Sequence, residues 1–224
     1  MSRQQSRQRY TEALAEYNPT HILGVDEVGV GAWAGPVYVG GTVTSANFAL
    51  VGLRDSKKVS ENAREPLCRA IYATPGLLHE VAYCSAAFVD QIGIQQAVAL
   101  LTKNVIELLS VRIEVPSYLI VVDGDIVPTG CRRSRDSHVL ALPKADDIVP
   151  AVMAAANIAK LQRDERMRLF EKEDPELYGP FGFAENKGYG TEHHRIALGQ
   201  HPPTALHRRS YRPVALACKK WRVS

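Results

Sequence analysis

The chain has 224 residues, of which 46% are hydrophobic and 23% are charged, and its formal net charge is +3 at pH 7. This balance indicates one large folded domain, or a domain with a small appendage, and excludes an intrinsically disordered chain. The apolar runs are much shorter than the roughly 20 residues of a membrane-spanning helix. The start, MSRQQSRQRYTEALAEY, lacks the apolar stretch of a secretory signal, so we expect neither secretion nor membrane association.

The spacing of apolar residues alternates between the period of strands and that of helices. Strands are predicted at 21–28, 37–45, 77–86, 117–125 and 138–147. Helices are predicted at 60–74, 91–111, 148–172, 191–199 and 211–218. Ser60 is expected to cap the first of these helices, and 117–125 is expected to be the central buried strand. This order predicts a mixed α/β sheet in a single domain, with a helical appendage from about residue 175.

Cysteine usage and the grouping of basic residues add two further expectations. The four cysteines, at positions 68, 84, 131 and 218, form no C-x-x-C pair, so we expect reduced thiols and a cytoplasmic location. Basic residues gather in CRRSR at 131–135, HRRSYR at 207–212 and CKKWR at 218–222. Such runs are either solvated loops or local patches that bind phosphate. Nothing in the sequence indicates an oligomer, so a monomer is expected.

Carboxylates occur where the predicted strands end. Asp26 and Glu27 close the first strand, Asp123 closes the strand over 117–125, and Asp146 stands just before the long helix. Strand ends can meet at one edge of a sheet, where clustered carboxylates repel one another unless cations bind. Oxygen ligands without Cys or His suit Mg²⁺ or Mn²⁺, and a pair of such ions can act on a phosphodiester. Asp123 or Asp146 taken alone is explained as well by a turn or a helix cap.

Six segments, in the same order along the chain, resemble the motifs of the ribonuclease HII family. They are GVDEVGVGAWAGP, LRDSKKVSE, LIVVDGD, PKADDIVPAVMAAANIAKLQRD, GFAENKGYGTEHH and PPTALHRRSY. The resemblance implies a ribonuclease H-like mixed sheet flanked by helices. We divide the chain into a polar lead at 1–20, a catalytic domain at 21–174 and a helical substrate-binding appendage at 175–224. The resemblance also implies an endonuclease that cleaves RNA in RNA–DNA hybrids and single ribonucleotides embedded in duplex DNA, leaving 3′-hydroxyl and 5′-phosphate ends.

The resemblance also implies roles for individual residues. Two divalent ions, Mg²⁺ or Mn²⁺, would be held by Asp26, Glu27, Asp123 and Asp146, with Asp26 shared between the ions. The residues implied in nucleic-acid contact are Gly29, Val30, Gly31, Ser56, Lys57, Lys58, Lys187, Tyr189, His207, Arg208 and Arg209. Tyr189 would stack near the RNA–DNA junction and help to sense the 2′-hydroxyl, although a tyrosine at the edge of the core would look the same. Lys58 is equally explained as part of a solvated turn, and His194 is expected to be structural.

The glycine-rich turn departs from the family at its middle residue. Ribonuclease HII usually carries Gly-Arg-Gly where this chain has Gly29-Val30-Gly31, so main-chain contacts with the nucleic acid are retained but a guanidinium contact is not. Smaller departures, none of which removes a metal ligand, are Ala145, Ala156, Asn157 and Gly190. Two alternatives stay open: a ribonuclease HIII-like enzyme without junction selectivity, and a hybrid-binding module without catalysis.

Overall fold

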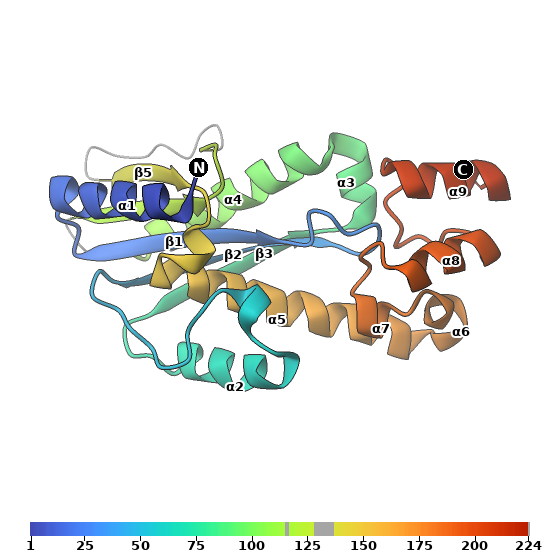
Figure 1. Ribbon diagram of the computed structural model, residues 1–224, viewed down its shortest axis with the longest axis horizontal. Helices are drawn as coiled ribbons and strands as arrows, with labels where there is room; N and C mark the ends of the chain where they lie inside the picture. The colour runs from blue at the N-terminus through green and yellow to red at the C-terminus, as the bar shows by residue number, and fades with distance from the viewer. Residues whose placement is uncertain (115–116, 128–136, 224) are drawn as a thin grey trace. The chain divides into compact units, whose positions relative to one another are not determined.

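The computed structural model of the protein describes residues 1–114, 117–127 and 137–223, and it shows a mixed five-stranded sheet flanked by helices (Figure 1). The strands are β1 (His21–Val28), β2 (Val37–Ser45), β3 (Leu78–Cys84), β4 (Tyr118–Asp123) and β5 (Ser137–Leu142). Their order in the sheet is β3-β2-β1-β4-β5, and β4 runs parallel to both β1 and β5. The predicted fold class is confirmed. As expected of the strand predicted over 117–125, β4 is buried and lies inside the sheet between β1 and β5, although β1 occupies the middle position.

Helices occupy most of the remaining chain. The α-helices are α1 (Arg3–Tyr17), α2 (Glu61–Tyr72), α3 (Ala86–Ile92), α4 (Ile94–Ser110), α5 (Pro150–Glu173), α6 (Pro175–Tyr178), α7 (Phe183–Asn186), α8 (Glu192–Gln200) and α9 (Arg212–Trp221). The 3₁₀ turns are η1 (Ser56–Lys58), η2 (Ala145–Asp147) and η3 (Gly179–Phe181). Among the described residues no single helix is long and apolar enough to cross a membrane; α3 and α4 reach that length and composition only together, across a bend of 110°.

Three sequence predictions are corrected at particular residues. The helix predicted over 91–111 is two helices, because Gly93 adopts a φ of 85° and ends α3. The strand predicted over 138–147 stops at Leu142, because Pro143 has no amide hydrogen with which to continue the ladder. Ser60 does precede α2, but its side chain makes no capping hydrogen bond.

The chain divides into two compact units. The first unit comprises Met1–Glu27, Val39–Ala82 and Ala99–Leu161, and the second comprises Val28–Tyr38, Tyr83–Val98 and Gln162–Ser224. The first unit holds most of the sheet, and the second holds the glycine-rich turn and the C-terminal helices. The division at residues 20 and 174 that we expect from the sequence stays a prediction.

In the first unit, α4 and α5 cover opposite faces of the sheet (Figure 1). Successive strand residues point to opposite faces, and two neighbouring glycines of β2 show this directly. A Cβ atom at Gly40 would lie 2.5 Å from the carbonyl oxygen of Ala155 in α5, whereas a Cβ atom at Gly41 would collide with Val105 in α4. Gly24 of β1 likewise leaves no room for a Cβ atom beneath α5. Glycine at these positions lets both helices approach the strands closely.

The polar lead at the start of the chain forms α1. Ser2 and Gln5 make a reciprocal capping box at its first turn, which satisfies amide groups that would otherwise lack a partner. On the inner side of the helix, Tyr10 and Ala13 are buried in a cluster that also contains Leu119 of β4. A few apolar residues on one face therefore suffice to dock an otherwise polar helix on the first unit.

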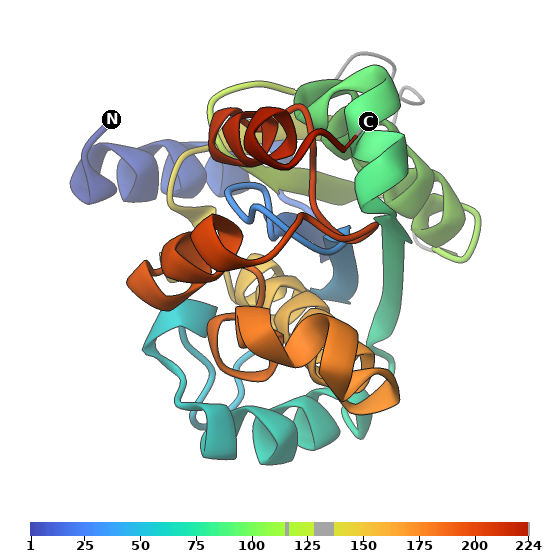
Figure 2. The same ribbon diagram turned by 90° about the vertical axis from the view of Figure 1, so that its right-hand side faces the viewer.

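The second unit has its own core around the rings of Phe181 and Phe183. Residues of α5, α8 and α9 belong to the same core cluster, and α8 and α9 contact each other. Figure 2 shows the C-terminal helices, in orange and red, on the side that faces the viewer. The segment after β1 enters this core at Ala34, which pairs with His207 in an isolated antiparallel bridge. On one side of the bridge Gly35 N donates to Leu206 O, and on the other Arg208 N donates to Trp33 O, each at 2.8 Å. The glycine-rich turn is thus anchored to the C-terminal segment.

Candidate active site

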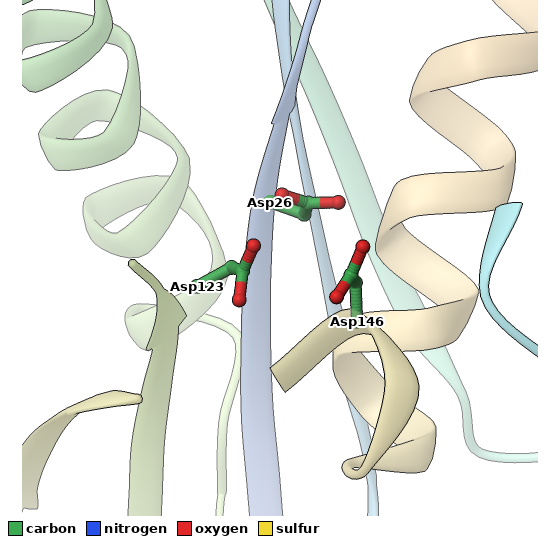
Figure 3. Close-up of side chains that lie close together, drawn as sticks. All are labelled: Asp26, Asp123 and Asp146. Carbon is green, nitrogen blue, oxygen red and sulfur yellow. The ribbon is translucent and has the colours of Figure 1, made fainter. Parts of the chain in front are cut away.

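Three of the four predicted carboxylates meet at one edge of the sheet. Asp26 lies in β1 and Asp123 ends β4, and these strands run parallel with Val25 opposite Val122, so the two acids are neighbours. Asp146 comes from η2, the turn between β5 and α5. One carboxylate oxygen from each acid lies within 4.8 Å of the others, and Figure 3 shows the three side chains turned toward one another.

The turn that carries Asp146 is held in place by Asp123. Oδ1 of Asp123 accepts a hydrogen bond of 2.7 Å from the amide of Ala145. The turn begins at Lys144, which adopts a left-handed φ of 63° directly after Pro143. Asp123 therefore contributes a carboxylate to the cluster and also positions a second one.

Burial and mutual repulsion make the cluster costly without a cation. Asp26 is 6% exposed, and its burial, followed by the charges of Asp123, Glu27 and Asp146, raises its pKa well above the usual value. Burial and the charge of Asp146 also raise the pKa of Asp123. A divalent cation would offset this repulsion, and three carboxylates without Cys or His form an oxygen donor set suited to Mg²⁺ or Mn²⁺. The residues present thus fit the metal that the sequence predicts.

Glu27, the fourth predicted acid, is not part of this triad. Side chains of a strand alternate between its two faces, and only Asp26 of the pair joins Asp123 and Asp146. The amide of Glu27 donates to Oδ1 of Asp26 at 2.8 Å. Burial and then the charge of Asp123 raise the pKa of Glu27, so its carboxylate is electrostatically coupled to the triad. A role for Glu27 as a metal ligand stays a prediction.

The predicted phosphate-binding lysines of η1 are paired with the acids of η2. Nζ of Lys57 lies 2.7 Å from Oδ2 of Asp146, and Nζ of Lys58 lies 2.6 Å from Oδ1 of Asp147. Burial is the largest single influence on the pKa of Lys57 and lowers it, but the hydrogen bond to Asp146 and the charges of the neighbouring carboxylates together raise the pKa above its usual value. Ser56 is buried, and its carbonyl accepts a hydrogen bond of 3.0 Å from Arg64. The lysines are therefore next to the triad, and their contact with phosphate stays a prediction.

Replacing Lys57 with methionine is expected to tighten divalent metal binding, because the ammonium competes with the cation for Asp146. The expected effect is about two- to fivefold, because the side chain of Lys57 is largely exposed and solvent weakens the ion pair. Titration calorimetry with Mg²⁺ and with Mn²⁺ measures the change. Lys58→Met is the matched control: it removes the same charge from a lysine that pairs with Asp147 instead. Equal tightening in both variants would show a general charge effect rather than competition at Asp146.

The glycine-rich turn in the second unit contains two glycines that differ in the space around them. Gly29 adopts a φ of 92°, and a Cβ atom there would collide with the side chain of Arg163. Gly31 is exposed, and a Cβ atom there would meet nothing within 4 Å. Packing within the described residues explains Gly29 but does not explain Gly31. The bare backbone at Gly31 is what close contact with a ligand requires.

Two of the basic-run residues predicted to line the nucleic-acid track are buried. Arg208 is 0% exposed and His207 is 1% exposed, so in this structure their side chains face the interior. Nη1 of Arg208 donates to the carbonyls of Gly29 at 2.7 Å and Val30 at 3.0 Å, and its Nε donates to Gly35 O at 3.0 Å. The role that the structure shows for Arg208 is support of the turn from within. Direct contact of either side chain with nucleic acid stays a prediction.

The neighbouring Arg209 is exposed, and its backbone is fixed. Its amide donates to Oδ2 of Asp90 at 2.7 Å, and the amide of Ser210 donates to Oδ1 of the same carboxylate at 2.9 Å. The side chain of Arg209, unlike those of His207 and Arg208, is therefore available to a phosphate. The basic run at 131–135 lies outside the described residues.

Tyr189, in the segment GFAENKGYGTEHH, is half-buried. Its ring centroid lies 5.2 Å from the guanidinium carbon of Arg163, and its amide donates to Asn186 O at 3.0 Å. Lys187, also predicted to meet the backbone of the nucleic acid, is 7% exposed, and its Nζ donates to the carbonyl of Ala184. Stacking of Tyr189 on a sugar or base, and contact of Lys187 with phosphate, stay predictions.

Sequence reasoning missed Arg163 and the reason for Gly190. Arg163 is 0% exposed, and its Nε donates to Pro36 O at 3.0 Å. It lies four residues from each of two buried α5 residues, Ala159 and Met167, and this spacing was the available indication that it faces inward. A Cβ atom at Gly190 would collide with the ring of Trp33, which explains the replacement noted at that position.

The family model and the sequence relatives agree on one family. The family model described as "Ribonuclease HII" matches residues 23–214. The ribonuclease HII of Dichelobacter nodosus is 36% identical over 198 residues, which cover 88% of this chain and 97% of that relative. The crystal structure of ribonuclease H2 from Pyrococcus horikoshii OT3 has a TM-score of 0.74 at 22% identity, and the match covers 91% of this chain and all of that one. The structure titled Bst-RNase HIII in complex with Mn²⁺ has a TM-score of 0.68 at 20% identity, covering 93% of this chain and 72% of that one. These two likenesses show the fold.

Proposed function

This chain belongs to the ribonuclease HII family of endonucleases that act on RNA–DNA hybrids, and we propose that it also cuts at single ribonucleotides embedded in duplex DNA by two-metal-ion hydrolysis. The observation that carries the proposal is the triad of Asp26, Asp123 and Asp146. A protein that only binds hybrids gains nothing from clustered negative charge beside a phosphate, so the triad favours catalysis over the binding-module alternative.

The family depends on divalent metal ions, and the oxygen donors of the triad suit them. We propose that Asp26, Asp123 and Asp146 hold two ions, Mg²⁺ or Mn²⁺, with Glu27 as a further ligand. Bound in this way, such ions supply an activated water and stabilise the charge that develops on the leaving oxygen. The related structure that contains Mn²⁺ shares the fold of this chain, which supports the choice of metal. The expected products carry 3′-hydroxyl and 5′-phosphate ends.

Other residues of this chain would bind and orient the nucleic acid. Lys57, once separated from Asp146, offers a point charge suited to a phosphate oxygen. The main chain at Gly31 is bare, so a 2′-hydroxyl or phosphate can approach it closely. The exposed guanidinium of Arg209 would add a phosphate contact, and Tyr189 would stack on the sugar near the junction. We propose that residues 175–224 act as the substrate-binding part of the chain.

We further propose that the protein works as a monomer in the cytoplasm. Cys68, Cys84 and Cys218 form no disulfide in the described part of the chain, which suits a reducing compartment. Sedimentation of the purified protein tests the monomer, and a dimer at working concentration would contradict it.

The middle residue of the glycine turn tests junction selectivity. We expect the wild-type protein to cleave both a long RNA–DNA hybrid and a duplex with one ribonucleotide, and Val30→Arg to raise kcat/KM for the latter roughly tenfold, the value of one charge-assisted hydrogen bond. Assays with each substrate in Mg²⁺ and in Mn²⁺ measure both effects, and Val30→Met controls for side-chain size. Cleavage of the long hybrid alone would support the ribonuclease HIII-like alternative, and no cleavage with either metal would support the binding module.

A further inference from the structure

Two buried histidines of the second unit form a hydrogen-bonded pair that ends on the backbone of Tyr189. His194 is 0% exposed and His207 is 1% exposed. Their Nε2 atoms lie 3.0 Å apart. Nδ1 of His194 lies 3.0 Å from Tyr189 O, and Nδ1 of His207 lies 3.0 Å from the amide of Thr204.

The partners at the two ends assign the protons along this chain of hydrogen bonds. A backbone amide can only donate, so Nδ1 of His207 accepts from Thr204, and the proton of His207 is on Nε2. A carbonyl can only accept, so Nδ1 of His194 carries its proton and donates to Tyr189. The two rings then fit each other: Nε2–H of His207 donates to the bare Nε2 of His194. The arrangement forms only when both imidazoles are neutral.

The surroundings of the pair keep it neutral. The rings of Phe181, Phe183 and Trp33 pack around it, with centroids 4.6 Å and 5.6 Å from that of His207 for the two phenylalanines and 5.4 Å from that of His194 for the tryptophan. Burial, and then the neighbouring His194, lower the pKa of His207 to about 3. Burial also lowers the pKa of His194. The guanidinium of Arg209 further lowers the pKa of His207.

The pair lies among the segments that carry the proposed nucleic-acid contacts. The amide of Thr191 donates to Tyr189 O at 2.8 Å, so His194 supplies the second hydrogen bond to this carbonyl. The backbone of His207 is bridged to Ala34, just after the glycine turn. Gly188 O in turn accepts the amides of Trp33 at 2.8 Å and Ala34 at 3.2 Å. One polar network therefore links the Tyr189 segment to the turn.

We propose that His194 and His207 are positioning residues. They fix the backbone of Tyr189 and thereby hold its ring in the position from which it stacks on the sugar of the substrate. The proposal rests on the proposed role of Tyr189 in substrate contact. The positioning role requires no direct contact between the histidines and the substrate. Their effect comes from fixing a carbonyl whose displacement by a fraction of an ångström would move the aromatic ring away from its stacking position.

Two substitutions of His194 separate its two hydrogen bonds. The amide nitrogen of asparagine reaches the position of Nδ1, so His194→Asn keeps the donor to Tyr189 but loses the link to His207. The amide oxygen of glutamine reaches the position of Nε2, so His194→Gln keeps the acceptor for His207 but loses the donor to Tyr189. Each variant lacks one buried hydrogen bond, so a purely structural role predicts similar damage in both.

The first readout does not depend on activity. We expect amide hydrogen exchange at Thr191, whose amide donates to the Tyr189 carbonyl, to accelerate about tenfold in His194→Gln and less than threefold in His194→Asn, relative to the wild-type protein. Equal exchange at Thr191 in all three proteins would overturn the proposal. The second readout is kcat/KM on the single-ribonucleotide duplex, which should fall roughly tenfold in His194→Gln and be largely recovered in His194→Asn.

A double-mutant cycle with Tyr189→Ala shows whether His194 acts through the tyrosine. We expect His194→Gln to cause no further loss of kcat/KM once Tyr189 is alanine, because the ring to be positioned is gone. The same fractional loss in both backgrounds would overturn the proposal. A full rate for Tyr189→Ala alone would contradict the proposed role of Tyr189 instead, while the exchange rates would still report whether His194 holds its backbone.

Discussion

Replacing Asp26 with asparagine is expected to abolish cleavage, by at least about a thousandfold, and to leave the metal-free protein more stable than the wild type. The carboxylate of Asp26 is buried within 4.8 Å of those of Asp123 and Asp146, so it is central to any cation that binds the triad. An amide of the same shape keeps the packing but removes the charge. Loss of turnover and gain in stability therefore have one cause.

The stability gain has a predictable dependence on pH. Burial raises the pKa of Asp26 above that of the unfolded chain, so the folded state binds the proton more tightly. As pH rises above about 3.9, the ordinary value for aspartate, the wild-type protein without metal loses stability because ionising the buried group is costly. Asp26→Asn should lack this part of the decline. Melting temperatures from pH 4 to pH 8 in excess chelator would measure the difference between the two proteins.

A matched acid controls for charge alone. Asp125 is exposed and stands two residues beyond Asp123, and Asp125→Asn should change neither turnover nor melting temperature appreciably. Full activity in Asp26→Asn, or wild-type activity in excess chelator, would contradict the metal-dependent mechanism. A lower melting temperature for Asp26→Asn would contradict the claim that the triad is under electrostatic strain.

The triad could be predicted because its geometry follows from strand order. Parallel strands bring their carboxyl ends to the same edge, so the pairing of β1 with β4 places Asp26 beside Asp123. The position of Asp146 depends on the backbone conformation of the turn before it, which the spacing of apolar residues does not predict. Pro143 stops β5, and the left-handed Lys144 turns the chain so that Asp146 points back to the cluster.

The substrate-contact residues were harder to predict for a physical reason. In the run from His207 to Arg209, His207 and Arg208 are buried, and Arg208 donates to carbonyls of the glycine-rich turn, whereas Arg209 is exposed. Composition identifies such a run as a basic patch, yet only a tertiary contact decides which members reach solvent. For the same reason the inward position of Arg163 was not predicted, because its partners are carbonyls more than a hundred residues away in sequence.

The inward position of Arg208 gives the second large expected effect: Arg208→Met should lower the free energy of unfolding by about 3–5 kcal/mol, or prevent folding altogether. The guanidinium donates to Gly29 O, Val30 O and Gly35 O. A methionine fills most of the volume but removes all three hydrogen bonds from the guanidinium, and each hydrogen bond from a charged donor contributes about 1.5–3 kcal/mol. Gly29 O keeps the amide of Ala32 and Val30 O keeps the hydroxyl of Tyr211, whereas Gly35 O loses its donor. Urea unfolding followed by circular dichroism measures the loss.

Two companion variants decide whether the forked geometry of Arg208 is the cause. Arg209→Met removes the same charge from an exposed position and should change the free energy of unfolding by less than about 0.5 kcal/mol. Arg208→Lys keeps the charge, but one ammonium cannot donate in the directions of all three carbonyls, so its stability should fall between those of the wild type and Arg208→Met. If Arg208→Lys matched the wild type, charge alone would suffice. If Arg208→Met unfolded at the wild-type urea midpoint, the turn would be held without Arg208, and the packing of Gly29 against Arg163 would become its principal support.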